Sequence, residues 1–454
     1  MKQINIPPIR IPEFRMPSLG LSTIGLPADR SGNRLAWPSG LKDSIVCWYS
    51  PRKQGLTEYD VIESYAEDFT TWRHLDSRGT AAVTPNKITI TESFDTTNIV
   101  EYVEEPYSDI SIYVTGVSED VPLVVRDITG NKAIITKDGK YDFSKNSRFM
   151  GFAINKILSN INVVISLLPT SILKDLSGNG NHAYLYGGKG KLNSGMGLYK
   201  VDFTSWRKSS VQTEVKPDVV KVTPNTSNYL FIQYANSVEI PSYKIKVIGL
   251  GDNVLKYQYA TENGRKEINI VEGENELPTS IKVSNDYQIG YRLTPGTSVF
   301  TITQIPDYPD QLCYNGSSYG IAYGLPILSD YTIIADRTWF ENNGNRVFAN
   351  KGNIWPNCAF TFEKINVSLN SETFSFSQST GIDDLRNKSG ITYQTKQSYN
   401  GNPISFGDSS DGEVLVIGGQ ITGEFVGCHG DILLFNRTLT DDEITWLKEN
   451  WEKL

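Results

Sequence analysis

The sequence predicts an all-β protein in which one β-sandwich is interrupted twice by copies of a smaller β module. Thr, Val, Ile and Tyr dominate the periodic runs, as half-buried strands favour. Asp-Phe-Thr-Thr-Trp-Arg at 68–73 returns as Asp-Phe-Thr-Ser-Trp-Arg at 202–207, and the similarity continues beyond each hexapeptide. Between the copies, 175–182 is a turn-rich segment of a different kind. A duplicated module separated by unrelated turns indicates insertions into a host domain.

Length and charge narrow the functional classes. A chain of 454 residues holds about three domains of ordinary size. The net charge of −8 argues against a nucleic-acid-binding protein and against a basic membrane-surface protein. No apolar run is long enough for a membrane-spanning helix, so we expect no membrane insertion. The N-terminus also lacks the apolar stretch of a secretory signal.

Residues 1–40 are expected to form an extended, proline-rich arm. Proline fixes φ and removes a backbone donor, so neither a helix nor a central strand can form across its six prolines. The arm is also rich in apolar residues, which a purely solvated tail would not favour. We therefore expect it to dock against a partner, with the candidate anchor residues Ile4, Ile6, Ile9, Ile11, Phe14 and Met16.

A first strand is predicted over 41–49, and the two modules follow it at 67–169 and 201–308. Both modules carry Val-Thr-Pro after the hexapeptide, then an alternating strand closed by glycine, then an apolar run ended by proline. Period-2 patterning with short turn-rich spacers predicts a small antiparallel sandwich for each copy. Two copies are too few for a solenoid.

The C-terminal part ends in the one clear helix signal. Strand candidates lie at 331–335, 345–349, 413–419 and 430–436. Thr440 and Glu443 have the spacing of a capping box, and acidic residues favour the start of the helix. Ile444, Leu447 and Trp451 then form one apolar stripe.

Two segments carry a resemblance to a known family. Asp-Leu-Ser-Gly-Asn-Gly-Asn-His-Ala at 175–183, and the strand-to-helix segment 430–444 with its Asn-Arg-Thr-Leu-Thr-Asp-Asp-Glu-Ile ending, resemble concanavalin A-like jelly rolls of the laminin-G-like type. The resemblance implies a jelly roll as the host, with two inserted β-sandwich modules, an extended N-terminal arm and a C-terminal helix. The expected divisions are arm 1–40, jelly roll 41–66, 170–200 and 309–454, and modules 67–169 and 201–308.

The combination further resembles proteins of Bacteroidales (crAss-like) bacteriophages, which place this jelly roll after a Trp-Tyr-x-Pro-x-x-Gln-Gly segment, here at 48–55. That resemblance implies a head or tail fibre or decoration in the virion, assembled in the host bacterial cytoplasm. Its implied partners are other virion proteins (capsid or tail), held through the arm, and host cell-surface glycans. We expect a homo-oligomer, because several weak sites presented together gain avidity.

Catalytic and metal-binding patterns are weak, and we predict no catalytic residues, cofactor or metal. The four cysteines are widely spaced and are expected to be buried small hydrophobes. The three histidines lack a Ser or Cys partner and are expected to be structural or at the surface. The Glu-x-Asp-x-x-Glu pattern, which would bring two carboxylates together on one strand, occurs once, at 58–63, and no predicted strand covers it. Asp408, Asp411 and Glu413 could hold calcium, but a solvated turn is favoured.

The tryptophans suggest where a glycan could bind. Trp72 and Trp206 recur in both modules within Thr-rich strands, which favours core anchors over sugar-stacking platforms. In the jelly roll, the candidate glycan face is Trp339, Asn342, Asn343 and Trp355. The predicted function is a non-enzymatic virion protein. Two alternatives stay open: a carbohydrate-binding lectin module of a bacterial surface protein, and a polysaccharide depolymerase, which the lack of such an acid pair on a predicted strand disfavours.

Overall fold

The all-β prediction is confirmed. The computed structural model describes residues 35–57, 60–102, 109–127, 130–143, 149–188, 193–208, 212–224, 229–341, 346–352, 358–365, 389–403, 412–419 and 425–454. Every paired strand in these ranges is antiparallel. No helix in these ranges is long and apolar enough to cross a membrane. The predicted anchor residues Ile4, Ile6, Ile9, Ile11, Phe14 and Met16 lie outside the described residues.

The chain divides into two compact units, and the described part of the smaller one consists of residues 35–44 and 439–454. In its described part the helix α3 (Asp441–Asn450) begins with the predicted capping box, in which Thr440 and Glu443 bond each other's backbone N–H groups. The short 3-10 turns η1 (Lys42–Ser44) and η5 (Trp451–Lys453) belong to the same unit. Because residues 42–44 form η1, the first strand starts later than the predicted residue 41.

The larger unit, residues 45–438, contains a two-sheet sandwich built from three separate stretches of chain. Its eight-stranded sheet has the order β14 (Met196–Leu198), β25 (Asp307–Asn315), β34 (Val426–Phe435), β27 (Thr332–Trp339), β30 (Ser389–Thr395), β31 (Ser398–Tyr399), β32 (Asn402–Pro403), and β1 (Ile45–Tyr49) pairs with β34. The six-stranded sheet has the order β12 (Ile172–Leu173), β13 (Ala183–Tyr186), β26 (Tyr319–Tyr323), β33 (Val414–Ile417), β28 (Arg346–Gly352), β29 (Cys358–Ile365).

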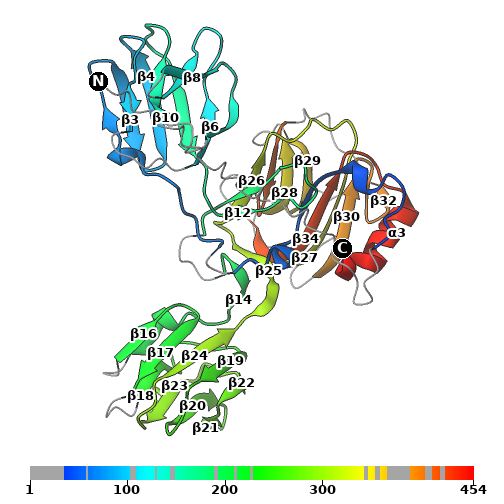
Figure 1. Ribbon diagram of the computed structural model, residues 1–454. Coiled ribbons are helices and arrows are strands. Elements are labelled where there is room, and N and C mark those ends of the chain that lie inside the picture. The colour runs from blue at the N-terminus through cyan, green and yellow to red at the C-terminus, as the bar shows by residue number, and fades with distance from the viewer. Residues whose placement is uncertain are drawn as a thin grey trace, which may run out of the picture. The chain divides into compact units, whose positions relative to one another are not determined.

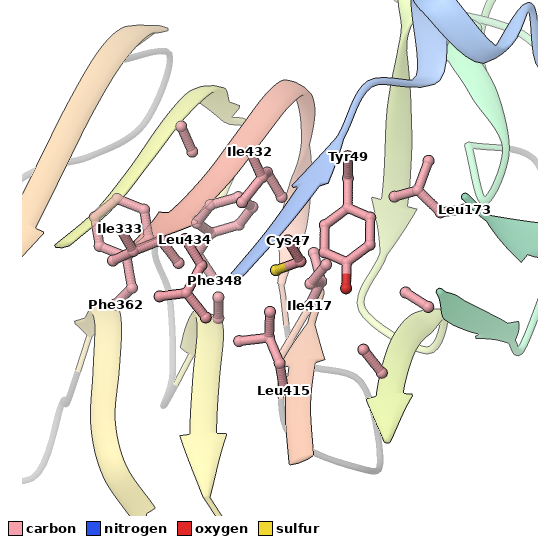
Figure 2. Close-up of a cluster of buried hydrophobic side chains, with 14 of the residues drawn as sticks. Cys47, Tyr49, Leu173, Ile333, Phe348, Phe362, Leu415, Ile417, Ile432 and Leu434 are labelled. Carbon is pink, nitrogen blue, oxygen red and sulfur yellow. The ribbon is translucent and has the colours of Figure 1, made fainter. Parts of the chain in front are cut away.

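The core of this jelly roll lies between the two sheets. Figure 2 shows side chains of both sheets pointing toward one another, and all of those labelled are buried. The eight-stranded sheet contributes Cys47, Tyr49, Ile333, Ile432 and Leu434, and the six-stranded sheet contributes Leu173, Phe348, Phe362, Leu415 and Ile417. Strands from residues 45–49, 172–198 and 307–435 therefore share one hydrophobic core, as an interrupted host domain requires.

The Asp-Leu-Ser-Gly-Asn-Gly-Asn-His turn fastens β1 to the second stretch of the jelly roll. The Asp175 side chain is buried and accepts hydrogen bonds from the backbone N–H groups of Trp48 (2.9 Å), Ser177 (2.9 Å) and Asn181 (3.0 Å). Leu176 N–H in turn donates to the carbonyl oxygen of Trp48 at 2.7 Å. One carboxylate thus closes its own turn and holds a strand more than a hundred residues earlier in the chain.

Two asparagine side chains complete this clamp. Asn179 Nδ2 donates to the carbonyl oxygens of Ile45 (2.7 Å) and Val46 (3.1 Å), and Asn181 Nδ2 donates to Val46 at 2.8 Å. Gly178 and Gly180 have φ values of 91° and 79°, which side chains disfavour, so glycine allows the turn to bring both amides to β1. We call this set of contacts the Asp175 clamp.

The two modules have the same fold. Each is a sandwich of two five-stranded sheets, and the strand orders correspond one for one. Module A has the sheets β2 (Arg73–His74), β5 (Val100–Glu101), β10 (Phe149–Ile154), β7 (Leu123–Asp127), β8 (Gly130–Ile135), and β3 (Gly79–Thr84), β4 (Lys87–Ser93), β11 (Val163–Leu167), β6 (Ile110–Thr115), β9 (Gly139–Phe143). Module B has the sheets β15 (Arg207–Lys208), β18 (Tyr229–Tyr234), β23 (Gln288–Thr294), β20 (Val254–Thr261), β21 (Gly264–Ile270), and β16 (Gln212–Val215), β17 (Val219–Thr223), β24 (Phe300–Ile305), β19 (Tyr243–Ile248), β22 (Gly273–Leu277), as Figure 1 shows.

The repeated hexapeptide has the same structural role in both modules. Asp68 and Asp202 each cap a 3-10 turn, η2 (Phe69–Thr71) and η4 (Phe203–Ser205), by accepting a bond from the backbone N–H two residues on. The turn directs the following tryptophan inward, where Trp72 and Trp206 are 4% and 5% exposed. Both tryptophans are therefore core anchors, as predicted, and neither has an indole face free to stack on a sugar.

Candidate functional surface

The candidate glycan residue Trp339 belongs to the core. It ends β27, is fully buried, and packs edge-on against Phe425 with ring centroids 4.7 Å apart. A sugar on the surface cannot reach its indole, so the predicted glycan-contacting role of Trp339 is corrected to a packing role. Asn342, Asn343 and Trp355 lie outside the described residues.

The residue after Trp339 is the one directed outward. Neighbouring strand residues face opposite sides of a sheet, so Phe340 lies on the outer face of the eight-stranded sheet. It is half-buried there, and its ring lies 5.8 Å from that of Tyr308, which is 39% exposed. We call Tyr308 and Phe340 the aromatic pair. Two consecutive aromatic residues at a strand end cannot both enter the core, and this signal could have identified Phe340 from the sequence.

A large bulge presents Tyr308. Met196 pairs with Leu312 whereas Leu198 pairs with Asp307, so two steps along β14 correspond to five along β25. The four residues 308–311 therefore lie opposite the single residue Gly197, and bulges redirect side chains at functional sites. Tyr308 has a φ of 52°, a left-handed conformation that costs a bulky residue about 1–3 kcal/mol and persists only where its surroundings impose it.

Polar groups adjoin the aromatic pair. Gln311, in the same bulge, donates from Nε2 to Asp336 Oδ2 at 3.2 Å and accepts a bond from the Cys428 thiol at 2.8 Å. Partial burial raises the pKa of Tyr308, and its hydroxyl bonds Thr338, so the phenol stays neutral and can donate or accept. Aromatic faces beside an amide and a carboxylate can pack on a sugar ring and bond its hydroxyls.

The structure also places Asp336 beside an acidic residue's step on the neighbouring strand, which spacing along the sequence does not reveal. The pairing of β27 with β34 is irregular between Ala335 and Arg337, so Asp336 lies opposite the Gly430–Asp431 step. Asp336 Oδ2 is so close to Gly430 that a β-carbon added there would lie 3.0 Å from it. The two acids come from different strands of the sheet, so a search for acids spaced along one strand could not find them.

Asp431 is committed to a structural role. It is only 3% exposed and accepts bonds from Trp48 Nε1, at 3.3 Å, and from the Ser50 side chain. Burial raises its pKa. Lys53 lies over the Trp48 ring, with Nζ 4.9 Å from the centroid. A glycoside hydrolase needs both acids to reach the scissile bond, and Asp431 instead ties β34 to β1.

The histidines have the structural or surface placements that the sequence predicted. His429 is fully buried between the Tyr314 hydroxyl, 3.0 Å from Nε2, and the Gly430 carbonyl oxygen, 2.7 Å from Nδ1. His182 Nδ1 accepts a bond from the Asp175 N–H at 3.0 Å, and His74 is exposed on β2.

The candidate calcium residues and the cysteines occupy separate parts of the chain. Among the described residues no group of three or more His, Cys, Asp or Glu side chains could hold a metal ion. Asp408 and Asp411 lie outside them, and Glu413 is exposed. Cys47, Cys313 and Cys428 are buried free thiols, as predicted.

Comparisons with known proteins do not assign a family. No protein-family model and no curated protein matches the chain. Among solved structures, a Trypanosoma rangeli sialidase in complex with sialic acid aligns with a TM-score of 0.22 and 10% identity, over 84% of each chain. The N-terminal CBM22-1–CBM22-2 tandem domain of Paenibacillus barcinonensis Xyn10C aligns with a TM-score of 0.16 and 12% identity, over 54% of this chain and 96% of that one. Likenesses at these TM-scores carry no argument about fold or function.

The buried His429 predicts an acid-sensitive jelly roll. Burial lowers its pKa from 6.5 to about 4. Between these values the unfolded state binds a proton that the folded state does not, so stability is present above pH 6.5 and is lost as pH falls through 4. We expect a loss of about 3 kcal/mol across this window.

Urea unfolding followed at pH 7 and pH 4 measures this loss. His429→Gln should show a clearly smaller decline than the unmutated protein, and the exposed control His74→Gln should show the same decline. Equal pH dependence in His429→Gln and the unmutated protein would contradict the assignment.

Proposed function

We propose that this chain is a non-enzymatic bacteriophage virion protein, a head or tail fibre or decoration, whose jelly roll binds host-surface glycans through the aromatic pair. The observation that carries the glycan part is the pair itself: exposed Tyr308, held in a left-handed conformation by the bulge, beside Phe340 and the bonded Gln311–Asp336 side chains. Its apolar faces and polar rim match the chemistry of a pyranose.

The non-enzymatic part is supported by what the buried polar groups do. Asp175 clamps β1, Asp431 bonds Trp48, and His429 bonds Tyr314 inside the core. These three buried groups are thereby occupied in holding strands together. A depolymerase is the second candidate, because Asp336 lies opposite the Gly430–Asp431 step and these two acids come from neighbouring strands.

The virion part rests on the motif resemblance at residues 48–55, 175–183 and 430–444. It implies that the arm binds capsid or tail proteins and that the protein is a homo-oligomer in the particle. The duplicated modules fit such a protein, since inserted β-sandwich domains add surface to a fibre or decoration without new chemistry. A lectin module of a bacterial surface protein would use the same aromatic pair without the arm.

Glycan binding predicts a specific effect of the aromatic pair. On an array of host capsular and surface glycans, we expect Phe340→Ala and Tyr308→Ala each to weaken binding about tenfold, since each removes about 1.4 kcal/mol of stacking. The matched control is Phe94→Ala, which removes an aromatic residue of module A that is 48% exposed. An array without any ligand, or equal binding by Phe340→Ala and Phe94→Ala, would sink the proposal.

The same polysaccharides test the alternative that the protein is a depolymerase. Prolonged incubation should release no reducing ends from a glycan that the array identifies as bound. If reducing ends appear and Asp336→Asn stops their release, the protein is a hydrolase.

Virion anchoring predicts that the arm is needed for incorporation. In a phage whose gene lacks codons 2–34, the truncated protein should fold and bind glycan but be absent from purified particles. A second variant keeps the arm's length and replaces Ile4, Ile6, Ile9, Ile11, Phe14 and Met16 with serine, and it should behave alike because the apolar side chains supply the docking energy. Particles with normal occupancy of either variant would disprove the anchor.

A further inference from the structure

Two of the buried cysteines face each other across neighbouring strands. Cys313 of β25 pairs directly with Cys428 of β34. The Cys313 N–H donates to Gly195 on the opposite side of β25, at 2.8 Å. The pair is therefore a non-hydrogen-bonded one, in which antiparallel Cα atoms lie about 4.5 Å apart. That separation falls within the range of about 4.4–6.8 Å that a disulfide spans.

The side chains share one face of the sheet. Leu312 and Tyr314 on either side of Cys313 point into the core, so Cys313 points outward, and its directly opposed partner does the same. The Cys313 thiol donates to the Cys428 sulfur, and the Cys428 thiol donates to Gln311 Oε1 at 2.8 Å. Both sulfur atoms are thus already directed at one another without any backbone movement.

Cys47 provides an internal contrast. It is equally buried, but its side chain bonds Tyr49 in the core between the sheets. Strand register therefore sets Cys313 and Cys428 apart from Cys47, although all three thiols are buried.

We propose that Cys313 and Cys428 are a redox pair that forms an intramolecular disulfide between β25 and β34 when the protein meets a small-molecule disulfide such as oxidised glutathione. One cysteine attacks the oxidant, releasing one glutathione thiol and leaving a mixed disulfide. The second cysteine then attacks the mixed disulfide, forming the Cys313–Cys428 bond and releasing the second glutathione thiol. Two S–H bonds and one S–S bond are replaced by one S–S bond and two S–H bonds.

Burial sets the rate of this reaction. The side chains of Cys313 and Cys428 are 1% and 0% exposed, and burial raises the pKa of the Cys313 thiol. Only the thiolate attacks a disulfide, so the folded, reduced protein reacts slowly, whereas a chain that folds in the presence of oxidant reacts while the thiols are accessible. This pair does not depend on the proposed glycan or virion function.

The test is to refold the full chain from urea in a buffer of oxidised and reduced glutathione, and in parallel with dithiothreitol. Remaining thiols are alkylated under denaturing conditions, and the digest is analysed by mass spectrometry without reduction. The oxidised sample should contain one linked peptide pair joining Cys313 to Cys428, with the loss of two hydrogen atoms, while Cys47 is fully alkylated. Cys313→Ser and Cys428→Ser should each abolish the linked pair, and Cys47→Ser should retain it.

Several results would overturn the proposal. They are a refolded oxidised protein in which both thiols remain alkylatable, a stable glutathione adduct on either residue, and a link from either residue to another cysteine. Matching circular dichroism spectra of the refolded samples ensure that each outcome refers to folded protein.

Discussion

The Asp175 carboxylate holds the first piece of the jelly roll to the second, and the rest of the architecture depends on that contact. β1 is only five residues long, and module A follows it in the chain before the jelly roll resumes. A strand this short gains little from its ladder with β34 alone. The clamp adds bonds from Asp175, Asn179 and Asn181 to three residues of β1, namely Ile45, Val46 and Trp48. Because Trp48 also bonds Asp431, the clamp fixes one end of the outer face as well.

The insertions are tolerated because each closes its own core. Module A packs Phe69 and Trp72 against Phe152, and module B packs Phe203 and Trp206 against Tyr291. Lengthening a connection costs only logarithmically in loop entropy, so a self-stabilised domain can occupy a loop of the host at small expense. Gln304 at the end of module B accepts bonds from Lys200 and Val201 at its start, which keeps the two ends of the insertion together.

The sequence alone predicted those parts of the fold that are determined by a few neighbouring residues. The capping box at Thr440, the Asn-Gly turn at 175–182 and the Asp-capped hexapeptides are each specified within a few residues. What the sequence did not show was the register of strands that carry bulges. The bulge at 308–311 brings Tyr308 to Phe340, and the bulge in β34 sets the Gly430–Asp431 step opposite Asp336. The pairing of Cys313 with Cys428 likewise depends on contact between distant strands, which no spacing along the chain reveals.

The central claim is that three stretches of chain form one cooperative jelly roll through the Asp175 clamp, while the modules fold independently. Segment-resolved hydrogen exchange of Asp175→Ala against the unmutated protein tests this most directly, with Ser177→Ala as a control in the same turn. Removing Asp175 leaves buried N–H groups unpaired, so protection should fall by about 3 kcal/mol in β1, β12–β14 and β25–β34 together, and stay unchanged in modules A and B. A loss confined to the turn at 175–182, or one that extends equally into the modules, would contradict the account.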